Sequence, residues 1–429
     1  MKKNILVFPC GSEIALEIHN ALKWSTHVAL FGGSSVSNHG EYVYSNYIGD
    51  IPDVEDADFI ERMEEIVQKY AIDFIFPAHD SVVLKLVQNK QALSCGIISS
   101  PVETCETCRS KKKTYDFLRG SINVPQIYAS ADEIRSYPVF LKPDVGQGSR
   151  GTYTASCIED IEFYAKKDPT LLMLEYLPGK EYTIDCFTDK NRELLFSGAR
   201  ERGRISGGIS VRTFPADMQK FRSMAEKINQ KLLFHGAWFF QVKEDRNGEL
   251  SLLEVAPRIA GSMALYRNLG VNFPLLSIFD TLGIDVRIMP NQYGIVMDRA
   301  LFNRFRAELE YRHVYIDLDD TIIFDGKVNP VVMAYLYQCF NEGIKIHLLS
   351  RHKERFGEDI RDVLKKFRIS EVFDSIDDIG VSDSKDTYIN EYPSIFIDDS
   401  FQERLAVYEK KAIPTFEVSS LESLISWKK

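Results

Sequence analysis

Residues 140–152 read FLKPDVGQGSRGT, a short apolar strand followed by a loop rich in glycine. Gly146 and Gly148 lack a Cβ, so the backbone N–H groups of this loop can approach an anion closely. Lys142, on the strand just before the loop, would bring a compact positive charge to the same anion. The stretch therefore predicts a phosphate-binding loop. Its residues are Gly146, Gln147, Gly148 and Ser149.

Polar residues end the strands that follow this loop. The strands are expected at 171–177, 181–188, 237–245 and 250–257, which indicates an α+β arrangement. Glu175 and Glu181 flank a Leu-Pro-Gly turn and are suited to hydrogen-bonding an adenine edge and a ribose. Gln241 and Glu254 end two adjacent strands and offer oxygen ligands of the kind that Mg²⁺ prefers. Arg258 follows closely enough to reach the phosphate end. Taken singly, each could be an ordinary turn or surface residue, so their order carries the prediction.

These features together resemble the ATP-grasp superfamily, in particular the large subunit of carbamoyl-phosphate synthase and its stand-alone carboxylate–amine ligase relatives. The resemblance rests on the Lys, the glycine-rich loop, the spacing ExxxGxE and the later Gln, Glu and Pro-Arg, and it covers residues 1–295. It implies two lobes that hold ATP together with Mg²⁺, or Mn²⁺ in its place. The nucleotide contacts implied by matching position are Lys111 and Lys142 on phosphates, Glu175 and the Leu177 backbone on adenine, and Glu181 on ribose.

The same resemblance implies a metal and substrate end of the site. Gln241 and Glu254 would hold Mg²⁺. Arg258, with Arg200 and Arg202, would face the acyl phosphate or the substrate carboxylate.

One departure from the family pattern lies at Ala256. The family commonly has Asn two residues after the metal-binding Glu, whereas Ala256 cannot ligate a metal. Either the second Mg²⁺ has fewer protein ligands and more water, which Mg²⁺ tolerates, or activity is impaired.

The reaction that the resemblance implies has two steps. A small-molecule carboxylate attacks the γ-phosphoryl group of ATP to give an acyl phosphate and ADP, and an amine or similar nucleophile then displaces phosphate. Two alternatives stay open. The chain could be an ATP-binding sensor or assembly protein without ligase turnover, or a kinase-like enzyme that stops at the acyl phosphate.

The first hundred residues alternate short apolar runs with amphipathic stretches, as in ILVF at 5–8, a helical pattern at 13–22 and HVALF at 27–31. This rhythm predicts βαβ units and a small parallel sheet. It resembles the N-terminal domain of the same family. We therefore expect a pre-ATP-grasp domain over 1–105, an ATP-grasp domain over 106–295 and a charged helical linker over 296–310.

A second chemical pattern begins at residues 313–321, which read HVYIDLDDT. Asp317 and Asp319 would project from the same side of a strand at its carboxyl end, where ligands sit in open α/β sheets. One carboxylate can attack phosphorus while its neighbour protonates the leaving group. Asp398 and Asp399 end another strand, so we expect Mg²⁺ between these carboxylates.

The order DLDDT, LLS, Lys385 and IDDS resembles the haloacid dehalogenase superfamily over residues 311–429. The resemblance implies a Rossmann-like phosphatase domain that acts on a phosphorylated small molecule. By matching position, Asp317 is the nucleophile, Asp319 the general acid and base, and Lys385 the charge stabiliser. The implied phosphate binders are Thr321 and Ser350, and the implied metal ligands are Asp317, Asp319, Asp398 and Asp399.

Composition sets the broad class. The chain has 429 residues, 45% hydrophobic and 27% charged, with a net charge of −10, so we expect several domains of mixed α/β and α+β type. The acidic balance argues against nucleic acid as a partner, and no apolar run is long enough to span a membrane. Seven cysteines in so long a chain favour a reducing cytoplasm over a disulfide framework. A homodimer is expected from the family resemblance.

Overall fold

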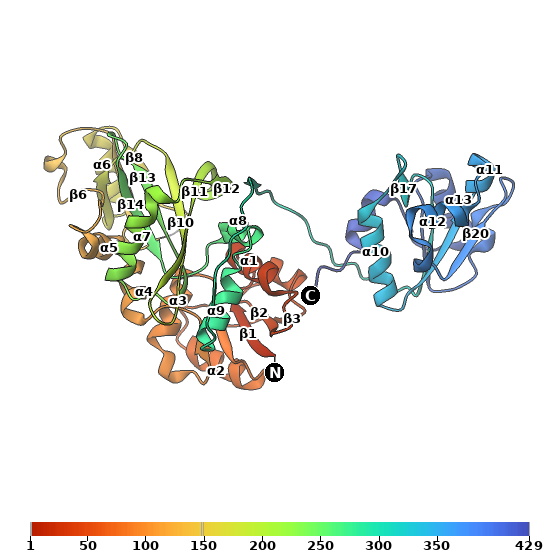
Figure 1. The fold of residues 1–429 in the computed structure, drawn as a ribbon, viewed down its shortest axis with the longest axis horizontal. Coiled ribbons are helices and arrows are strands. Elements are labelled where there is room, and N and C mark those ends of the chain that lie inside the picture. Colours follow the sequence, from red (N-terminus) through yellow and green to blue (C-terminus); the bar gives the residue numbers. More distant parts are fainter. Residues whose placement is uncertain (1, 147, 149, 429) are drawn as a thin grey trace. The chain divides into compact units, whose positions relative to one another are not determined.

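The computed structural model describes residues 2–146, 148 and 150–428. It divides into two compact units, one ending at Leu301 and the other covering Phe302–Lys428. In Figure 1 the first unit runs from red to green and the second is blue. Each unit is described by itself below.

The first unit begins with a parallel sheet in the order β3-β2-β1-β4-β5, and this confirms the predicted βαβ rhythm. Its strands are β1 (Lys3–Phe8), β2 (Val28–Gly33), β3 (Asn46–Ile48), β4 (Phe74–Pro77) and β5 (Gly96–Ile97). The connecting helices are α1 (Glu13–Leu22), α2 (Phe59–Lys69) and α3 (Asp80–Gln88).

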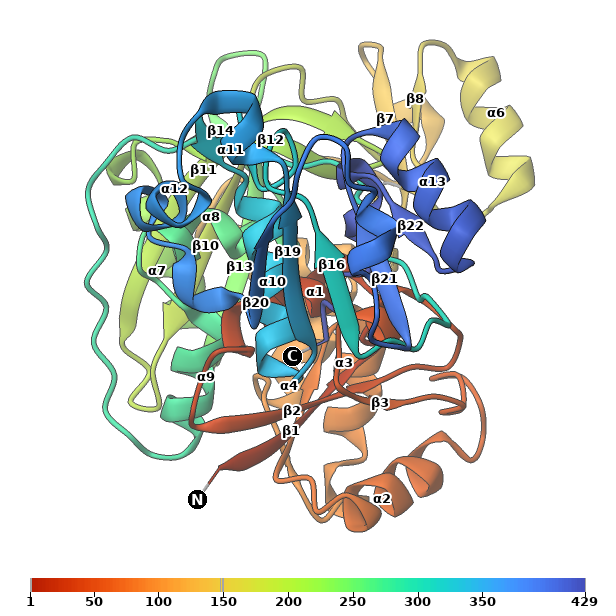
Figure 2. The ribbon, with the colours of Figure 1, turned by 90° about the vertical axis from the view of Figure 1, so that its right-hand side faces the viewer.

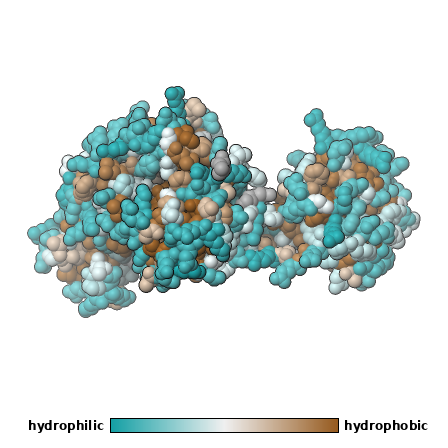
Figure 3. All heavy atoms as spheres, turned by 90° about the horizontal axis from the view of Figure 1, so that it is seen from below, coloured by the Kyte–Doolittle hydropathy of each residue, from teal (hydrophilic) through white to brown (hydrophobic). Residues whose placement is uncertain are grey.

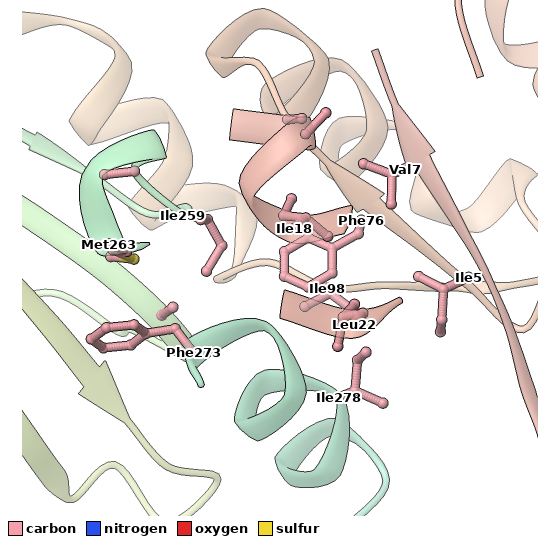
Figure 4. Packing of buried hydrophobic residues seen from close by; sticks show 14 of the residues in the cluster. Ile5, Val7, Ile18, Leu22, Phe76, Ile98, Ile259, Met263, Phe273 and Ile278 are labelled. Carbon is pink, nitrogen blue, oxygen red and sulfur yellow. The ribbon is translucent and has the colours of Figure 1, made fainter. Parts of the chain in front are cut away.

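Both faces of this sheet are buried, because successive residues of β1 point to opposite sides. Ile5 and Val7 pack with Ile18 of α1, whereas Leu6 packs with Phe59 of α2. The core that contains Ile5 and Val7 continues into α9 (Phe273–Thr281), as Figure 4 shows. It also continues into the larger antiparallel sheet described below. This shared core explains why the chain up to Leu301 is one compact unit. The boundary expected at residue 105 therefore stays a prediction.

Two further sheets of the first unit are antiparallel wherever their pairing is described. The smaller has the order β6-β9-β7-β8 and the larger the order β14-β13-β10-β11-β12-β15. The smaller contains β6 (Ile127–Tyr128), β7 (Val139–Pro143), β8 (Tyr153–Ala155) and β9 (Leu171–Glu175). The larger contains β10 (Glu181–Thr188), β11 (Leu194–Ser206), β12 (Ile209–Pro215), β13 (Gly236–Glu244), β14 (Leu250–Ala256) and β15 (Met297–Asp298). The four predicted strands in this region lie at nearly the expected positions.

Helices support these sheets from the outside. α6 (Ile158–Lys167) lies beside β7 and β8, as Figure 2 shows, and α7 (Gln219–Lys231) packs against β10 and β11. Two consecutive helices, α4 (Val102–Arg109) and α5 (Lys111–Leu118), both contact β14.

The predicted helical linker over 296–310 is wrong in its secondary structure. β15 occupies its start, and residues 299–311, all of which are described, have no regular structure. A short isolated helix is marginal in water unless an apolar face packs against something. Leu301 and Phe305 are exposed here, whereas Leu309 packs against the core of the second unit, so the apolar residues of this segment do not share one packed face.

The second unit contains a parallel sheet in the order β20-β19-β16-β21-β22. Its strands are β16 (His313–Ile316), β19 (Lys345–Ser350), β20 (Ser375–Asp378), β21 (Ser394–Ile397) and β22 (Thr415–Phe416). A small hairpin of β17 (Ile323–Phe324) and β18 (Lys327–Val328) follows β16. The helices are α10 (Pro330–Asn341), α11 (His352–Phe356), α12 (Ile360–Phe367) and α13 (Phe401–Lys411).

Helices cover both faces of this second parallel sheet. Val314 and Ile316 of β16 share a core with residues of α10 and α12, whereas Tyr315 shares one with Val407 of α13. The surface visible in Figure 3 is mostly hydrophilic, with smaller hydrophobic patches. Among the described residues, no helix combines the length and the apolar character needed to cross a membrane.

Candidate functional site

The residues predicted to bind a nucleotide converge on one cavity of about 290 Å³ in the first unit. The cavity lies between the smaller and the larger antiparallel sheet, and both contribute side chains to it. The predicted residues that line it are Lys111, Lys142, Gly146, Gly148, Glu175, Leu177, Glu181, Arg202, Gln241 and Glu254. Gln147 and Ser149, which were also predicted, lie outside the described residues.

Lys142 is the most deeply placed cation of this cavity, with 6% of its surface exposed. Its Nζ donates to the Tyr115 hydroxyl at 2.7 Å and to the Leu253 carbonyl at 3.1 Å. Burial, helped by the nearby charge of Lys111, lowers the pKa of Lys142 to about 7. A polyanion in the cavity would favour the charged form again.

Lys111 lies at the start of α5 and closes the same end of the cavity. Its Nζ donates to the backbone carbonyls of Asp144 at 3.3 Å and of Gly146 at 3.1 Å, so it also holds the glycine-rich loop. Burial lowers the pKa of Lys111. Gly148 has a φ of +60°, which a residue with a Cβ rarely adopts. The backbone conformation at Gly148 therefore favours glycine.

The other end of the cavity suits a flat ring. Phe140, Leu174 and Leu177 provide apolar wall, and Glu175 lies at its edge. The Glu175 carboxylate accepts a hydrogen bond from the Gln126 backbone N–H at 3.3 Å, which fixes its position. These groups can hold an apolar ring with a polar rim.

Three side chains that line the cavity, Arg202, Glu181 and Gln241, are bonded to one another. Arg202 Nη1 lies 2.7 Å from Glu181 Oε1 and 2.7 Å from Gln241 Oε1. Arg202 Nη2 donates to the Gly208 carbonyl at 2.7 Å. Arg202 thus lines the cavity and bonds to the two side chains that were expected to bind ribose and metal.

Gln241 and Glu254 face each other across β13 and β14, because their Cα atoms are paired in register. Directly opposed side chains on one face of an antiparallel pair are close neighbours. Their oxygen atoms form a donor set of the type Mg²⁺ accepts. Ala256, two residues after Glu254 on β14, offers no oxygen ligand from its side chain.

Arg200 corrects the predicted set, because it does not belong to the described lining of the cavity. It is 1% exposed, and its Nε and Nη2 donate to the two carboxylate oxygens of Asp185 at 2.7 and 3.0 Å. β11 carries Arg200 two residues deeper into the packed interior than Arg202. Its guanidinium is therefore occupied by a buried ion pair.

Arg258 lines a second, smaller cavity of about 60 Å³. Its Nε and Nη2 donate to the carboxylate of Asp80 at 2.6 and 2.7 Å. Burial opposes the ionisation of Asp80, but Arg258 outweighs it and lowers the pKa of that carboxyl. This cavity shares Lys111 and Glu254 with the first, so the two are neighbours.

Asp80 and its neighbour Arg109, which also lines the second cavity, were missed by sequence reasoning. The available signal was the position of Asp80 just after a buried strand of a parallel sheet, where ligands commonly bind.

The second unit gathers its predicted charged residues at the carboxyl end of its parallel sheet. Lys385 Nζ donates to Asp317 Oδ1 at 2.6 Å and to Asp398 Oδ2 at 2.6 Å. All three side chains are buried. Burial, with Asp398 adding to it and Lys385 opposing it, raises the pKa of Asp317 to about 7. The cluster therefore favours an added positive charge.

Three carboxylates of this cluster could hold a cation together. Oxygen atoms of Asp317, Asp398 and Asp399 lie within 4.8 Å of one another. Thr321 supports the group, because its hydroxyl accepts the Asp399 backbone N–H at 3.1 Å. The donor set fits Mg²⁺, which binds through a few carboxylates and water.

Asp319 is held beside this cluster by Ser350, the last residue of β19, and by His352, the first residue of α11. The Ser350 hydroxyl donates to Asp319 Oδ2 at 3.3 Å, and His352 Nδ1 lies 2.8 Å from Asp319 Oδ1. His352 was not predicted. Its place two residues after Ser350 was the only signal available in the sequence.

Comparisons with known proteins bear on the first unit. A family described as "ATP-grasp in the biosynthetic pathway with Ter operon" matches residues 167–299. A comparison with curated proteins gives no match.

Several solved structures are similar in fold. The biotin carboxylase domain dimer of 2-oxoglutarate carboxylase from Hydrogenobacter thermophilus, in complex with MgADP, ADP and bicarbonate, has a TM-score of 0.56 at 17% identity, covering 68% of this chain and 72% of that one. L-amino acid ligase from Bacillus licheniformis has a TM-score of 0.53 at 16% identity, covering 66% and 73%. N5-carboxyaminoimidazole synthetase from Staphylococcus aureus, complexed with ADP, has a TM-score of 0.54 at 16% identity, covering 68% and 80%.

The first unit has an ATP-grasp fold. This confirms the fold expected from the resemblance, and the coarse class of a mixed α/β multidomain chain with it. At these identities the likeness concerns the fold alone.

Proposed function

We propose that the first unit is an ATP-dependent ligase that joins a small-molecule carboxylate to an amine and releases ADP and phosphate. The observation that carries the proposal is the convergence of Lys111, Lys142, Glu181, Gln241 and Glu254 on one cavity beside a glycine-rich loop. The similar structures are of two kinds that fit it, an amino acid ligase and proteins crystallised with ADP.

The proposed placement follows from the chemistry of each wall. The apolar end near Phe140 would take adenine, Glu181 the ribose hydroxyls, and Lys111 and Lys142 the phosphates. Mg²⁺, when bound by Gln241 and Glu254, would neutralise part of the phosphate charge. Phosphoryl transfer needs mainly positioning and cations, and the chain supplies both.

The reaction would proceed in two steps. A carboxylate oxygen attacks the γ-phosphorus, the bond between that phosphorus and the β–γ bridging oxygen breaks, and ADP leaves. The neutral amine then attacks the acyl carbon, the bond to the phosphate oxygen breaks, and the nitrogen loses a proton. The second cavity, beside Arg258 and Lys111, is the proposed place of the acyl group.

For the second unit we propose a Mg²⁺-dependent phosphatase with an aspartate nucleophile, as its resemblance to the haloacid dehalogenase superfamily implies. An Asp317 oxygen would attack phosphorus while Asp319 donates a proton to the leaving oxygen. Water would then release phosphate from the aspartyl phosphate, with Asp319 as base. Lys385, which bonds Asp317 and Asp398, would offset the negative charge that gathers there.

Product dependence tests the ligase proposal. With ATP and Mg²⁺, the chain should form ADP only when a carboxylate and an amine are both supplied. ADP formation with the carboxylate alone would favour the kinase-like alternative. Nucleotide binding without any turnover across a panel of carboxylates and amines would favour a sensor, for which Ala256 is the supporting observation.

The phosphatase proposal has its own test. Phosphate release from a panel of phosphorylated small molecules should require Mg²⁺ and should be lost in Asp317→Asn. Release that is unchanged in this variant for every compound would reject the proposal. A substrate of the phosphatase that is also a substrate or product of the ligase would explain why one chain carries both units.

A further inference from the structure

Arg202 is bonded to two side chains that are also proposed to bind the nucleotide and its Mg²⁺. A single nitrogen, Nη1, contacts both Glu181 Oε1 and Gln241 Oε1, each at 2.7 Å. Only 6% of the Arg202 side chain is exposed. Its Nε is buried and has no hydrogen-bond partner among the described residues. The guanidinium is therefore held in the cavity by acceptors that have another proposed use.

Both of those acceptors are needed when a nucleotide binds. In the proposed function, on which this inference rests, Glu181 accepts the ribose hydroxyls and Gln241 ligates Mg²⁺. A dication at Gln241 would also place two positive charges next to the guanidinium, which repels it. The contacts of Arg202 seen here therefore compete with a bound Mg²⁺-nucleotide for the same two side chains.

The strand that carries Arg202 can accommodate such a movement. β11 and β12 form a hairpin whose tip contains Gly207 and Gly208, with φ of +55° and +77°. The pairing of these strands is irregular between Arg202 and Arg204 and again between Arg204 and Ile205. By contrast, Arg200 is fixed by two bonds to one buried carboxylate.

We propose that a bound Mg²⁺-nucleotide displaces the Arg202 guanidinium. Glu181 and Gln241 hold this guanidinium while the site is empty, and in the complex it contacts the phosphoryl group that is transferred. The phosphates supply the new partner, because the displaced guanidinium stays within the same cavity as Lys111 and Lys142. A planar guanidinium suits a phosphoryl group, since it can donate two parallel hydrogen bonds.

Two calorimetric titrations of the full chain test this, and neither requires the natural substrates. The first measures Mg²⁺-ADP binding, and the second adds aluminium fluoride, which completes a mimic of the transferring phosphoryl group. The variant is Arg202→Met. The matched control is Arg204→Ala, which removes an exposed arginine of the same strand that pairs with Asp298.

Arg202→Met should bind Mg²⁺-ADP about threefold to tenfold more tightly than the unaltered chain, because the competing cation is gone. It should also lose most of the affinity that aluminium fluoride adds. Arg204→Ala should leave both quantities unchanged. Weaker Mg²⁺-ADP binding in Arg202→Met, or an undiminished gain from fluoride, would overturn the proposal. If the unaltered chain binds no nucleotide, the proposed function itself is wrong, and so is the proposed displacement of Arg202.

Discussion

Nucleotide binding should be coupled to proton uptake at Lys142. Its Nζ is buried, and the pKa is lowered to about 7 by burial and then by Lys111. At pH 7 such a group carries about half a proton, and at pH 8 about a tenth. If phosphates restore the ordinary pKa, binding should take up about 0.5 proton at pH 7 and about 0.9 at pH 8.

The sign of the pH dependence follows from the same shift. The bound form holds the proton more tightly, so nucleotide affinity is greatest below pH 7 and falls as pH rises from there toward the pKa of the bound state. The fall approaches about tenfold per pH unit.

Calorimetry of Mg²⁺-ADP binding in buffers of different ionisation enthalpy measures the uptake directly. The matched control is Lys142→Arg, because arginine stays charged throughout this range. Uptake that belongs to the nucleotide itself is common to both proteins and cancels in the difference. A difference near zero at both pH values would show that Lys142 is not the group that takes up the proton.

Three other predictions follow from the structure. Arg200→Met should lower the free energy of unfolding of the first unit by about 3 to 5 kcal/mol in urea titrations, because it leaves Asp185 buried and unpaired. Adding Asp185→Leu should recover much of that loss, and an unchanged unfolding midpoint in Arg200→Met would contradict this prediction. Millimolar Mg²⁺ should raise the unfolding temperature of the second unit in calorimetry, and Asp398→Asn should abolish the shift; a shift that survives the substitution would place the cation elsewhere. Limited proteolysis should first cut within residues 299–311, which have no regular structure, and mass spectrometry should find two resistant fragments; first cuts inside β10 or β16 would contradict the division.

The parts of the fold that the sequence predicts are those set by local pattern. Apolar runs bounded by turn residues place β1 and β13 correctly, and the glycine-rich loop after β7 follows from the backbone freedom of glycine. The linker fails for the converse reason. Its charged, helix-like pattern does not specify one packed apolar face: Leu301 is exposed, whereas Leu309 packs against the core of the second unit.

Site residues that depend on packing depth or on distant segments could not be predicted in the same way. Arg200 and Arg202 are one strand period apart, and only the position of Asp185 decides that the first is buried in an ion pair while the second reaches the cavity. Asp80 meets Arg258 from 178 positions away in the sequence. No local pattern indicates such a contact.

We propose that Lys142 and Glu254 belong to one Mg²⁺-nucleotide site. Titration of Mg²⁺-ATP into the unaltered chain and into the Lys142→Met and Glu254→Gln variants tests this. One nucleotide should bind per chain, and each variant should lose at least about tenfold in affinity. Equal affinity in all three proteins would show that these two side chains do not share a nucleotide site.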